Sequence, residues 1–321
     1  MPTNADSPAP VALRDVRVNL VRPKEPVTAR VHRSELCSAS RKAAGFCRHI
    51  EIDVSGTPLE GACAAGQSIG VLAPGSDDAG KPHKVRLYSL ASPSNGEDGD
   101  GKVVSTTVKR VVDEHWDTHA LFLGVASNYL CDLQEGDELR VTGPAGKRFV
   151  LPDNPADYRY TFVATGTGIA PFRGMLADLL DAGCNNDITL IMGAPYATDL
   201  LYHEDFLRAA AEHPNFRYIT AISREKQDDG HDRMYVQARF RTERDALLPQ
   251  LSSDNNLIYI CGLAGMELGV FQELARSLKG DTLERYLNVS GEALADVDQW
   301  DRKTLSQHVK PTDRVKLEVY A

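Results

Sequence analysis

Hydrophobic and polar positions alternate differently in the two halves of the chain. Up to about residue 150, short runs rich in β-branched and aromatic residues are separated by clusters of Gly, Pro, Asp and Ser. The runs are HIEIDV at 49–54, KVRLYSLAS at 84–92, KVVSTTVKRVV at 102–112 and DELRVTG at 137–143. Short strands with such turns between them are typical of an antiparallel barrel or sandwich. Residues 92–101 are expected to form an exposed hairpin tip.

After a Pro- and Asp-rich linker at 151–159, the pattern changes. Apolar strand-like runs follow at 160–165, 187–193, 216–222 and 257–261, with helix-like segments between them, and RVKLEVY at 314–320 is a last strand-like run. In residues 265–278, Met266, Val270, Leu274 and Leu278 recur every four positions, which indicates an amphipathic helix. Strands alternating with helices predict a parallel sheet with helices on both faces.

The length of 321 residues exceeds the usual size of one domain and favours two. The predicted boundaries are a flexible N-terminal extension at 1–30, a β-barrel domain at 31–153 and an α/β domain at 158–321. No apolar run approaches the roughly 20 residues that a membrane span needs. The N-terminus lacks the pattern of a secretory signal or a transit peptide, so a cytoplasmic location is expected. The protein is also expected to be a monomer.

Charge and cysteine spacing exclude several classes of function. The net charge of −9 argues against nucleic acid as the main partner. The six cysteines show no C-x-x-C spacing, which argues against a zinc ribbon or an iron–sulfur cluster, and no metal site is predicted. Residues 11–50 hold nine Lys/Arg against three acids. This stretch is either a solvated surface or a docking face for an acidic protein partner.

The segment ATGTGIAPFRGML at 164–176 contains two glycines one residue apart, at the point where the first strand of the α/β half turns into its first helix. It matches neither the G-x-G-x-x-G fingerprint nor a P-loop. Gly166 and Gly168 would let the backbone approach a ligand, and Pro171 suits the first helical turn. A helix N-terminus at this crevice favours phosphate. A glycine-rich turn without a ligand is the alternative interpretation.

Five further segments bear on function: RLYS at 86–89, GVASNYL at 124–130, SREKQDDGHDRMYVQ at 223–237, CGLAGME at 261–267 and EVY at 318–320. With the glycine turn, and in this order, they resemble the plant-type ferredoxin–NADP(H) reductase family over nearly the whole chain from about residue 30. The resemblance implies two domains: an N-terminal antiparallel β-barrel that binds FAD and a C-terminal α/β, Rossmann-like parallel sheet that binds NADP.

The resemblance also implies a set of FAD-binding residues. Arg86 would hold the pyrophosphate, Tyr88 and Tyr320 would cover the two faces of the isoalloxazine ring, and Ser89 would lie near flavin N5. Ser89, Cys261, Glu318 and Tyr320 would be the catalytic residues. The complete FAD set is Arg86, Leu87, Tyr88, Ser89, Gly124, Val125, Ala126, Ser127, Asn128, Thr167 and Tyr320.

The NADP-binding residues follow from the same resemblance. Ser223, Arg224, Arg233 and Tyr235 would hold the adenosine 2′-phosphate, because a hydroxyl, two guanidiniums and a ring suit a dianion. For Ser223 and Arg224 alone, an exposed loop is the simpler interpretation. The complete NADP set is Lys109, Thr165, Gly166, Thr167, Gly168, Ser223, Arg224, Arg233, Tyr235, Gln237, Cys261, Gly262, Leu263 and Glu267.

The chain departs from the family pattern at several positions. Asp113 stands where a tyrosine commonly stacks on the FAD adenine. Either His115 or Trp116 substitutes for that tyrosine, or the adenine is held loosely. Ala264 replaces a frequent basic residue, and Ala321 follows the tyrosine at which members typically end. The segment 284–313 is longer than expected, and its function is not readable.

The resemblance implies a flavoprotein oxidoreductase that moves electrons between NADPH and a one-electron carrier such as ferredoxin or flavodoxin through FAD. Two alternatives remain open. One is the reductase component of an oxygenase, in which any iron–sulfur centre lies on a separate chain. The other is a nucleotide-binding regulatory module without turnover, against which the joint presence of Ser89, Cys261 and Glu318 argues.

Overall fold

The N-terminal half is an antiparallel barrel, as the short alternating runs predict. The structure is a computed structural model that describes residues 10–43 and 45–320. The strands are β1 (Val27–Leu36), β2 (Cys47–Asp53), β3 (Ser68–Leu72), β4 (Arg86–Ser89), β5 (Val103–Lys109) and β8 (Glu138–Ala145), in the spatial order β4-β3-β8-β1-β2-β5. A bridge between Leu90 and Thr106 joins the two end strands and closes the sheet. Alternate residues such as Ile50 and Ile52 fill the interior.

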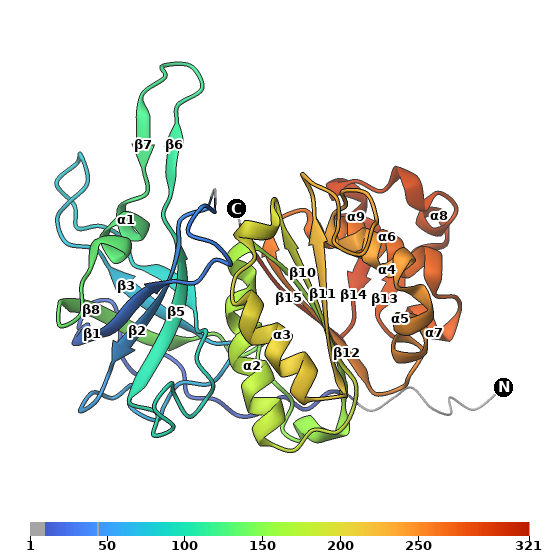
Figure 1. The fold of residues 1–321 in the computed structure, drawn as a ribbon, viewed down its shortest axis with the longest axis horizontal. Coiled ribbons are helices and arrows are strands. Elements are labelled where there is room, and N and C mark those ends of the chain that lie inside the picture. The colour runs from blue at the N-terminus through green and yellow to red at the C-terminus, as the bar shows by residue number, and fades with distance from the viewer. Residues whose placement is uncertain (1–9, 44, 321) are drawn as a thin grey trace.

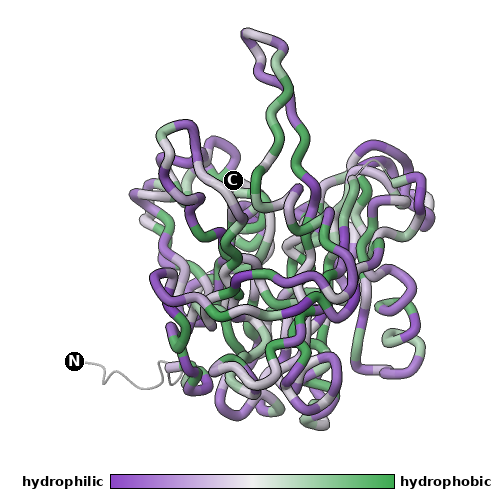
Figure 2. The backbone as a smooth tube through the Cα atoms, turned by 90° about the vertical axis from the view of Figure 1, so that its left-hand side faces the viewer, coloured by the Kyte–Doolittle hydropathy of each residue, from purple (hydrophilic) through white to green (hydrophobic). Residues whose placement is uncertain are grey.

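A second, two-stranded hairpin projects from the barrel (Figure 1). It consists of β6 (Val112–Glu114) and β7 (Leu121–Leu123), followed by α1 (Val125–Asp132). Its strands are hydrophobic over much of their length (Figure 2), and Trp116 at its tip is 93% exposed.

The loop at 92–101 is exposed only in part, which corrects the expectation of an exposed hairpin tip. Asn95 and residues 98–100 are exposed. Ser94 and Glu97 are half-buried, because their side chains hydrogen-bond to Asp178 and Arg173 of the α/β domain.

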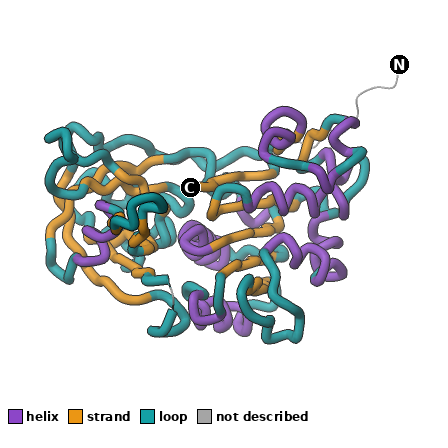
Figure 3. Tube along the Cα trace, turned by 90° about the horizontal axis from the view of Figure 1, so that it is seen from above, coloured by secondary structure: helices purple, strands orange, loops and turns teal. Residues whose placement is uncertain are grey.

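The C-terminal half contains the predicted parallel sheet. Its strands are β9 (Arg159–Thr165), β10 (Ile188–Ala194), β11 (Phe216–Ile222), β12 (Asn256–Leu263) and β15 (Val315–Tyr320), in the order β11-β10-β9-β12-β15. Neighbouring strand residues alternate between two cores: Phe162 packs with α2 (Ala170–Asp181) and α3 (His203–Glu212), and Val163 with α5 (Arg244–Leu251) and α6 (Met266–Ser277). Helices therefore cover both faces of the sheet (Figure 3).

The segment 284–313 forms a small layer against the second of these cores. It contains β13 (Leu287–Val289) and β14 (Val309–Pro311), which pair antiparallel, with α8 (Gly291–Leu294) and α9 (Arg302–His308) between them. Leu287, Trp300 and Val309 are buried against α6. The remaining short elements are α4 (Arg239–Thr242), α7 (Asp281–Glu284) and the 3₁₀ turns Pro155–Asp157, Gly166–Ile169, Ala197–Asp199, Val236–Ala238 and Val297–Gln299.

Residues 10–26 lie along both domains. Val11 donates a backbone hydrogen bond to Asp313, and Arg14 forms an ion pair of 2.9 Å with Asp178 of α2. Val21 bridges to Gly143 of the barrel. Residues 1–9 of the expected extension lie outside the described residues. Among the described helices, none has the length and apolar character to cross a membrane.

Candidate functional site

The carboxyl end of β15 lies between the two domains (Figure 1), and it brings the predicted catalytic residues together. Glu318 pairs in register with Cys261 on β12, and Ser68 of the barrel donates a 3.5 Å hydrogen bond to the Glu318 carboxylate. Ser68 in turn lies opposite Ser89 on β4. Sequence reasoning missed Ser68, because a serine inside an ordinary strand carries no local signal for a contact 250 residues away.

Burial dominates the electrostatics of this group. It raises the pKa of Glu318 from 4.5 to about 7, against the opposing effect of hydrogen bonds from Ser68 and Ser89. Its Oε2 atom is buried without a hydrogen-bond partner among the described residues. Burial, reinforced by the neighbouring Glu318, also raises the pKa of Cys261, which keeps its thiol neutral. A neutral thiol and a carboxyl that titrates near pH 7 suit positioning and proton handling rather than nucleophilic attack.

Tyr320 lies next to this group at the mouth of the crevice. Its hydroxyl and that of Thr167 are hydrogen-bonded at 2.7 Å, and its backbone carbonyl accepts from Ala264. The side chain keeps an exposed face, while partial burial raises its pKa. Ala321, the residue that follows this tyrosine, lies outside the described residues.

The two glycines of the turn have different roles. Gly166 has a φ of +54° and no neighbour within 4 Å of where a Cβ would stand, so its free side faces open space. Gly168 instead packs on β12, because a Cβ there would come within 2.2 Å of the Cys261 carbonyl oxygen. Gly262 is equally required, since its Cβ would lie 2.1 Å from Thr165 Oγ1. Pro171 occupies the first turn of α2, as predicted.

The predicted FAD residues of the barrel lie on β4 and at the start of α1. Arg86 and Leu87 are exposed, whereas burial raises the pKa of Tyr88 to about 12. Ser127 and Asn128 hold the turn before the helix, because their side chains bind the backbone of Val111 and Gly124. Gly124, Val125 and Ala126 form the turn and first helical residues themselves.

The projecting hairpin bears on the expected adenine contact. Asp113 lies directly across from Phe122, and the ring of His115 stands edge-on to Phe122 with centroids 5.9 Å apart. Trp116 lies beyond them at the tip of the hairpin. The rings of His115 and Phe122 therefore pack together close to Asp113. Trp116 forms no such ring contact among the described aromatic pairs.

The predicted 2′-phosphate residues are brought together by the loop after β11. Met234 donates a backbone hydrogen bond to Ile222, which sets Arg233 and Tyr235 beside Ser223 and Arg224. All four side chains are exposed or half-exposed. The buried Gln227 closes this loop, since its amide binds both the N–H and the C=O of Ile222. Sequence reasoning missed Gln227 because it reads as one more polar loop residue.

The CGLAGME segment follows β12 along the same edge. Leu263 is exposed, Glu267 accepts from the Gly265 N–H, and the side chain of Gln237 packs where a Cβ on Gly269 would stand. This chain has Ala264 where the family pattern has a basic residue. The structure brings a basic side chain to this position from another segment. Arg302 of α9 donates a 3.2 Å hydrogen bond to the Ala264 carbonyl. The segment 284–313 thus brings a cation to this edge, which sequence spacing could not reveal.

Four of the cations predicted to bind the cofactors have no ion pair among the described residues. Arg86, Lys109, Arg224 and Arg233 are exposed, and none forms an ion pair within residues 10–43 and 45–320. The two dinucleotides that the sequence predicts would bring several phosphate charges here, and guanidiniums and helix N-termini are what oppose such charges. The free cations, the open side of Gly166 and the orphaned Glu318 oxygen together fit FAD and NADP(H).

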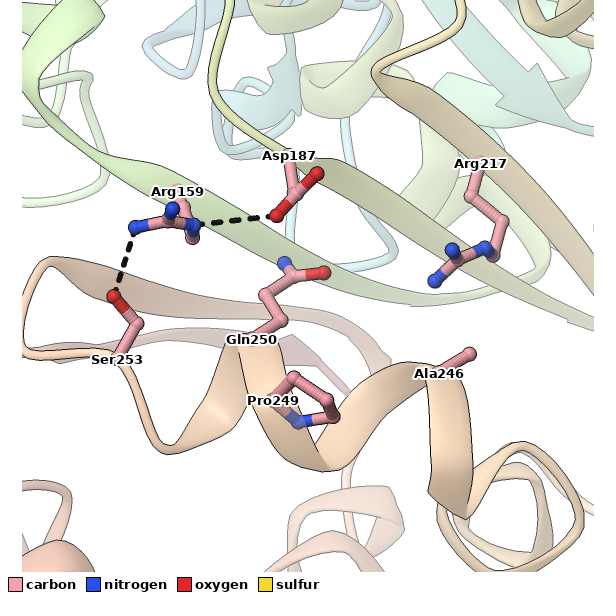
Figure 4. Close-up of a pocket in the computed structure, with 7 residues that line it drawn as sticks. All are labelled: Arg159, Asp187, Arg217, Ala246, Pro249, Gln250 and Ser253. Carbon is pink, nitrogen blue, oxygen red and sulfur yellow. Dashed lines mark hydrogen bonds and ion pairs between the residues drawn. The ribbon is translucent and has the colours of Figure 1, made fainter.

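A cavity of about 350 Å³ lies elsewhere, at the amino ends of the parallel strands (Figure 4). Arg159, Asp187, Arg217, Ala246, Pro249, Gln250 and Ser253 line it. Arg159 is already bonded to Asp187 and Ser253, and none of the predicted site residues reaches this cavity. Because α/β sheets bind ligands at the carboxyl ends of their strands, the cavity is not the candidate site.

Comparison with known proteins agrees with this geometry. A family model described as an oxidoreductase NAD-binding domain matches residues 162–271. The chain is 39% identical over 265 residues to ferredoxin–NADP reductase of Spirulina sp., covering 81% of this chain and 89% of that one. It is 40% identical over 264 residues to leaf isozyme 1 of chloroplastic ferredoxin–NADP reductase from Arabidopsis thaliana, covering 79% of this chain and 70% of that protein.

Solved structures show the same fold. Ferredoxin–NADP⁺ reductase from Plasmodium falciparum aligns with a TM-score of 0.69 and 22% identity, over 94% of this chain and 99% of that one. The same protein with 2′P-AMP aligns with a TM-score of 0.68 and 20% identity, over 95% of this chain and 100% of the other. At this identity the likeness establishes the two-domain fold alone.

Proposed function

The chain belongs to the ferredoxin–NADP reductase family, and we propose that the residues gathered at its carboxyl-edge crevice transfer electrons between NADPH and a small one-electron carrier. The observation that supports this assignment is the meeting of Ser68 and Ser89 from the barrel with Cys261 and Glu318 from the parallel sheet. These side chains come from both domains, so the crevice exists only where the domains join.

FAD is a cofactor of this family, and its binding residues here are a proposal. Arg86 opposes the pyrophosphate, the turn Gly124–Asn128 offers backbone N–H groups, and Tyr88 and Tyr320 contact the ring system. When bound, FAD supplies the conversion between two-electron hydride transfer and one-electron transfer. What the chain contributes is orientation, exclusion of water and control of a proton at Glu318.

NADPH is held by the loops after β9, β11 and β12. Arg224 and Arg233 bind the 2′-phosphate, with Ser223 as a hydroxyl donor and Tyr235 as a stacking ring. The Gly166 turn and Arg302 oppose the pyrophosphate. A guanidinium at Arg302 replaces the basic side chain that position 264 lacks, which gives a role to the otherwise unread segment 284–313.

Glu318 controls the protonation of the crevice. Its buried carboxyl, with a pKa of about 7, exchanges a proton at neutral pH, and Ser68 and Ser89 hold it in one orientation. The neutral Cys261 beside it fills the space against the nicotinamide without adding charge. This arrangement excludes water from one side of the reacting region and keeps a proton available there.

Tyr320 acts as a gate in this proposal. The nicotinamide and the tyrosine ring require the same place, so the ring has to move when NADP(H) binds productively. Loss of the ring in Tyr320→Ser is therefore expected to tighten NADP⁺ binding. Equal NADP⁺ dissociation constants for the wild type and Tyr320→Ser, measured by flavin absorbance difference, would remove the gate.

The carrier is ferredoxin or flavodoxin in this proposal, acting as a separate chain on a monomeric reductase. Of the nine basic residues at 11–50, Arg14, Arg30 and Arg33 form ion pairs within the protein. The other six form no ion pair in the described part of the chain. Arg48 hydrogen-bonds to Ser34 instead, and the remaining five are the proposed docking charges for an acidic carrier. These five are Arg17, Arg22, Lys24, Arg41 and Lys42.

NADPH-driven reduction of cytochrome c tests the function as a whole. Ferredoxin, flavodoxin and no carrier are compared with the same flavin-loaded protein, at low and high salt. A carrier-dependent rate that falls with salt supports electrostatic docking. A protein that reduces dyes from NADPH but neither carrier would keep the hydride site and overturn the proposed partner.

A further inference from the structure

A second buried cluster lies on the barrel, where it contacts the α/β domain. Its members are His49 and Glu51 on β2 and Glu97 on the loop after β4. One ligand atom from each residue falls within 4.8 Å of the others. His49 is 3% exposed, and its Nε2 atom has no hydrogen-bond partner among the described residues.

The unpartnered His49 nitrogen points between two carboxylates. It lies 3.6 Å from an oxygen of Glu51 and 3.6 Å from an oxygen of Glu97. These separations are too long for hydrogen bonds. They are close to the roughly 3.4 Å that separates two ligands of one tetrahedral ion whose bonds are about 2.1 Å long. From this geometry we propose that His49, Glu51 and Glu97 bind a divalent first-row metal ion, with Zn²⁺ as the fitting representative.

The surroundings already resemble an outer shell of a metal site. The Nδ1 atom of His49 is hydrogen-bonded to the Tyr202 hydroxyl at 2.9 Å, which leaves Nε2 as the lone-pair nitrogen when Nδ1 donates. Ser105, at 2.5 Å, and Arg173, at 2.6 Å, both donate to Glu97 Oε1, the oxygen that lies 3.6 Å from His49 Nε2, and a metal ion at this oxygen would share it with them. Metal-binding histidines and carboxylates are commonly oriented by such partners.

The charges around the cluster leave room for a cation. Arg173 compensates Glu97 directly, through two hydrogen bonds. Besides His49, the basic side chains near Glu51 within the described chain are the more exposed Arg33, at 3.7 Å, and His32, at 3.9 Å. Solvent screens both of these longer contacts. The carboxylate of Glu51 therefore keeps most of its negative charge for a bound ion.

The site joins the two domains through these partners. His49, Glu51 and Glu97 belong to the barrel, whereas Tyr202 and Arg173 belong to the α/β domain. An ion bound here fixes the histidine and the 97 loop, and through them the hydroxyl and guanidinium of the neighbouring domain. Its expected effect is to stabilise the domain junction without touching the electron-transfer crevice. The cysteine spacing that argued against metals gives no information on this histidine–carboxylate set.

The direct test is Zn²⁺ binding to chelator-treated, flavin-loaded protein, followed by calorimetry and by thermal unfolding. We expect one tight site per chain and a higher melting temperature with Zn²⁺. His49→Gln and Glu51→Gln are expected to abolish that site and the thermal shift. Tyr202→Phe, which removes only the orienting hydroxyl, is expected to weaken binding by about 10- to 100-fold.

The matched control is His119→Gln, which removes the exposed His119 that pairs with Glu114 on the projecting hairpin. This control should bind Zn²⁺ like the wild type. Glu51→Gln serves as the decisive variant if His49→Gln does not fold, as judged by circular dichroism and flavin content. Zn²⁺ affinity that is unchanged in both variants overturns the proposal. So does the absence of tight binding to the wild type.

Discussion

The two edges of the parallel sheet differ in how their polar groups are satisfied. At the amino edge, the cavity of about 350 Å³ is lined in part by side chains that bind one another, as Arg159 binds Asp187 and Ser253, while Arg217 forms no ion pair among the described residues (Figure 4). At the carboxyl edge, Arg224 and Arg233 have no ion pair in the described part of the chain, and a Glu318 oxygen is buried without a partner.

The presence of a cavity therefore does not by itself mark this protein's site. A polar group that has found its partner inside the protein contributes to folding, whereas an unpaired cation or buried oxygen has bonding capacity left for a ligand. The carboxyl edge also carries the glycines that let two loops touch, at Gly168 and Gly262. Four predictions test this difference between the two edges. They are given from the largest expected effect to the smallest.

Burial of Glu318 gives the largest expected effect, on stability. Its pKa is about 7 in the folded protein and near 4.5 when unfolded, so its contribution to stability is fully present below pH 4.5 and is lost as the pH rises through 7. Glu318→Gln avoids that loss. Relative to the wild type, the variant should gain stability on the order of 3 kcal/mol between pH 4.5 and pH 8. Denaturant unfolding at both pH values measures it, and parallel curves for the two proteins would contradict it.

The same substitution should damage turnover. A glutamine side chain cannot exchange a proton, so we expect kcat of Glu318→Gln for NADPH oxidation to fall by about 100-fold, the lower end for loss of an acid–base group. Stopped-flow measurement of flavin reduction separates this step from carrier reduction. An unchanged rate would show that Glu318 serves packing alone.

The 2′-phosphate site should respond through a single charge. Arg224→Ala removes a charge-assisted hydrogen bond and should weaken NADPH binding by about 1.5–3 kcal/mol, or roughly 10- to 150-fold, while NADH binding stays the same. Arg217→Ala is the matched control, because Arg217 is a cation of the amino-edge cavity with no ion pair in the described residues. Equal losses for both nucleotides, or for both variants, would contradict the contrast between the edges.

The amino edge should matter for folding only. Gln250 is buried there and binds Thr189, Tyr160 and Thr161. Gln250→Leu removes the hydrogen bonds to these partners and should lower the free energy of unfolding by about 1–3 kcal/mol. Chemical denaturation measures the cost, and kcat should remain that of the wild type. Normal stability together with an impaired kcat would contradict this prediction, because it would assign a functional role to the amino edge.

Local pattern predicted most of the fold. Every predicted strand of the parallel sheet exists because its alternation or its buried run reflects packing between two helical layers, as at Phe162 and Val163. The run at 102–112 was predicted as one strand, but β5 ends at Lys109. The break follows from Arg110, which turns to bind Asn128 and Asp132 of α1, a contact that no local pattern encodes.

The site divides in the same way. Gly166 could be named from the glycine-rich turn, and Glu318 and Arg224 from the segments that resemble the ferredoxin–NADP(H) reductase family. Ser68 and Arg302 could not, because each becomes relevant only through a partner far along the chain.

The loop at 92–101 shows the reverse failure. Its Gly- and Asp-rich composition predicts exposure throughout. In the structure, Arg173 holds Glu97 against the other domain, so half of the loop belongs to the junction. Composition reports how a segment turns, and it cannot report which distant side chain will bind there.

Anaerobic titration of the purified, flavin-loaded protein with NADPH and, separately, with NADH tests the carboxyl-edge site most directly. Flavin absorbance is followed in both titrations. If the free cations at Arg224 and Arg233 form the 2′-phosphate site, NADPH bleaches the flavin at far lower concentration than NADH. Equal bleaching by the two nucleotides would contradict that site, and a yellow protein that neither nucleotide bleaches would contradict hydride transfer at this crevice altogether.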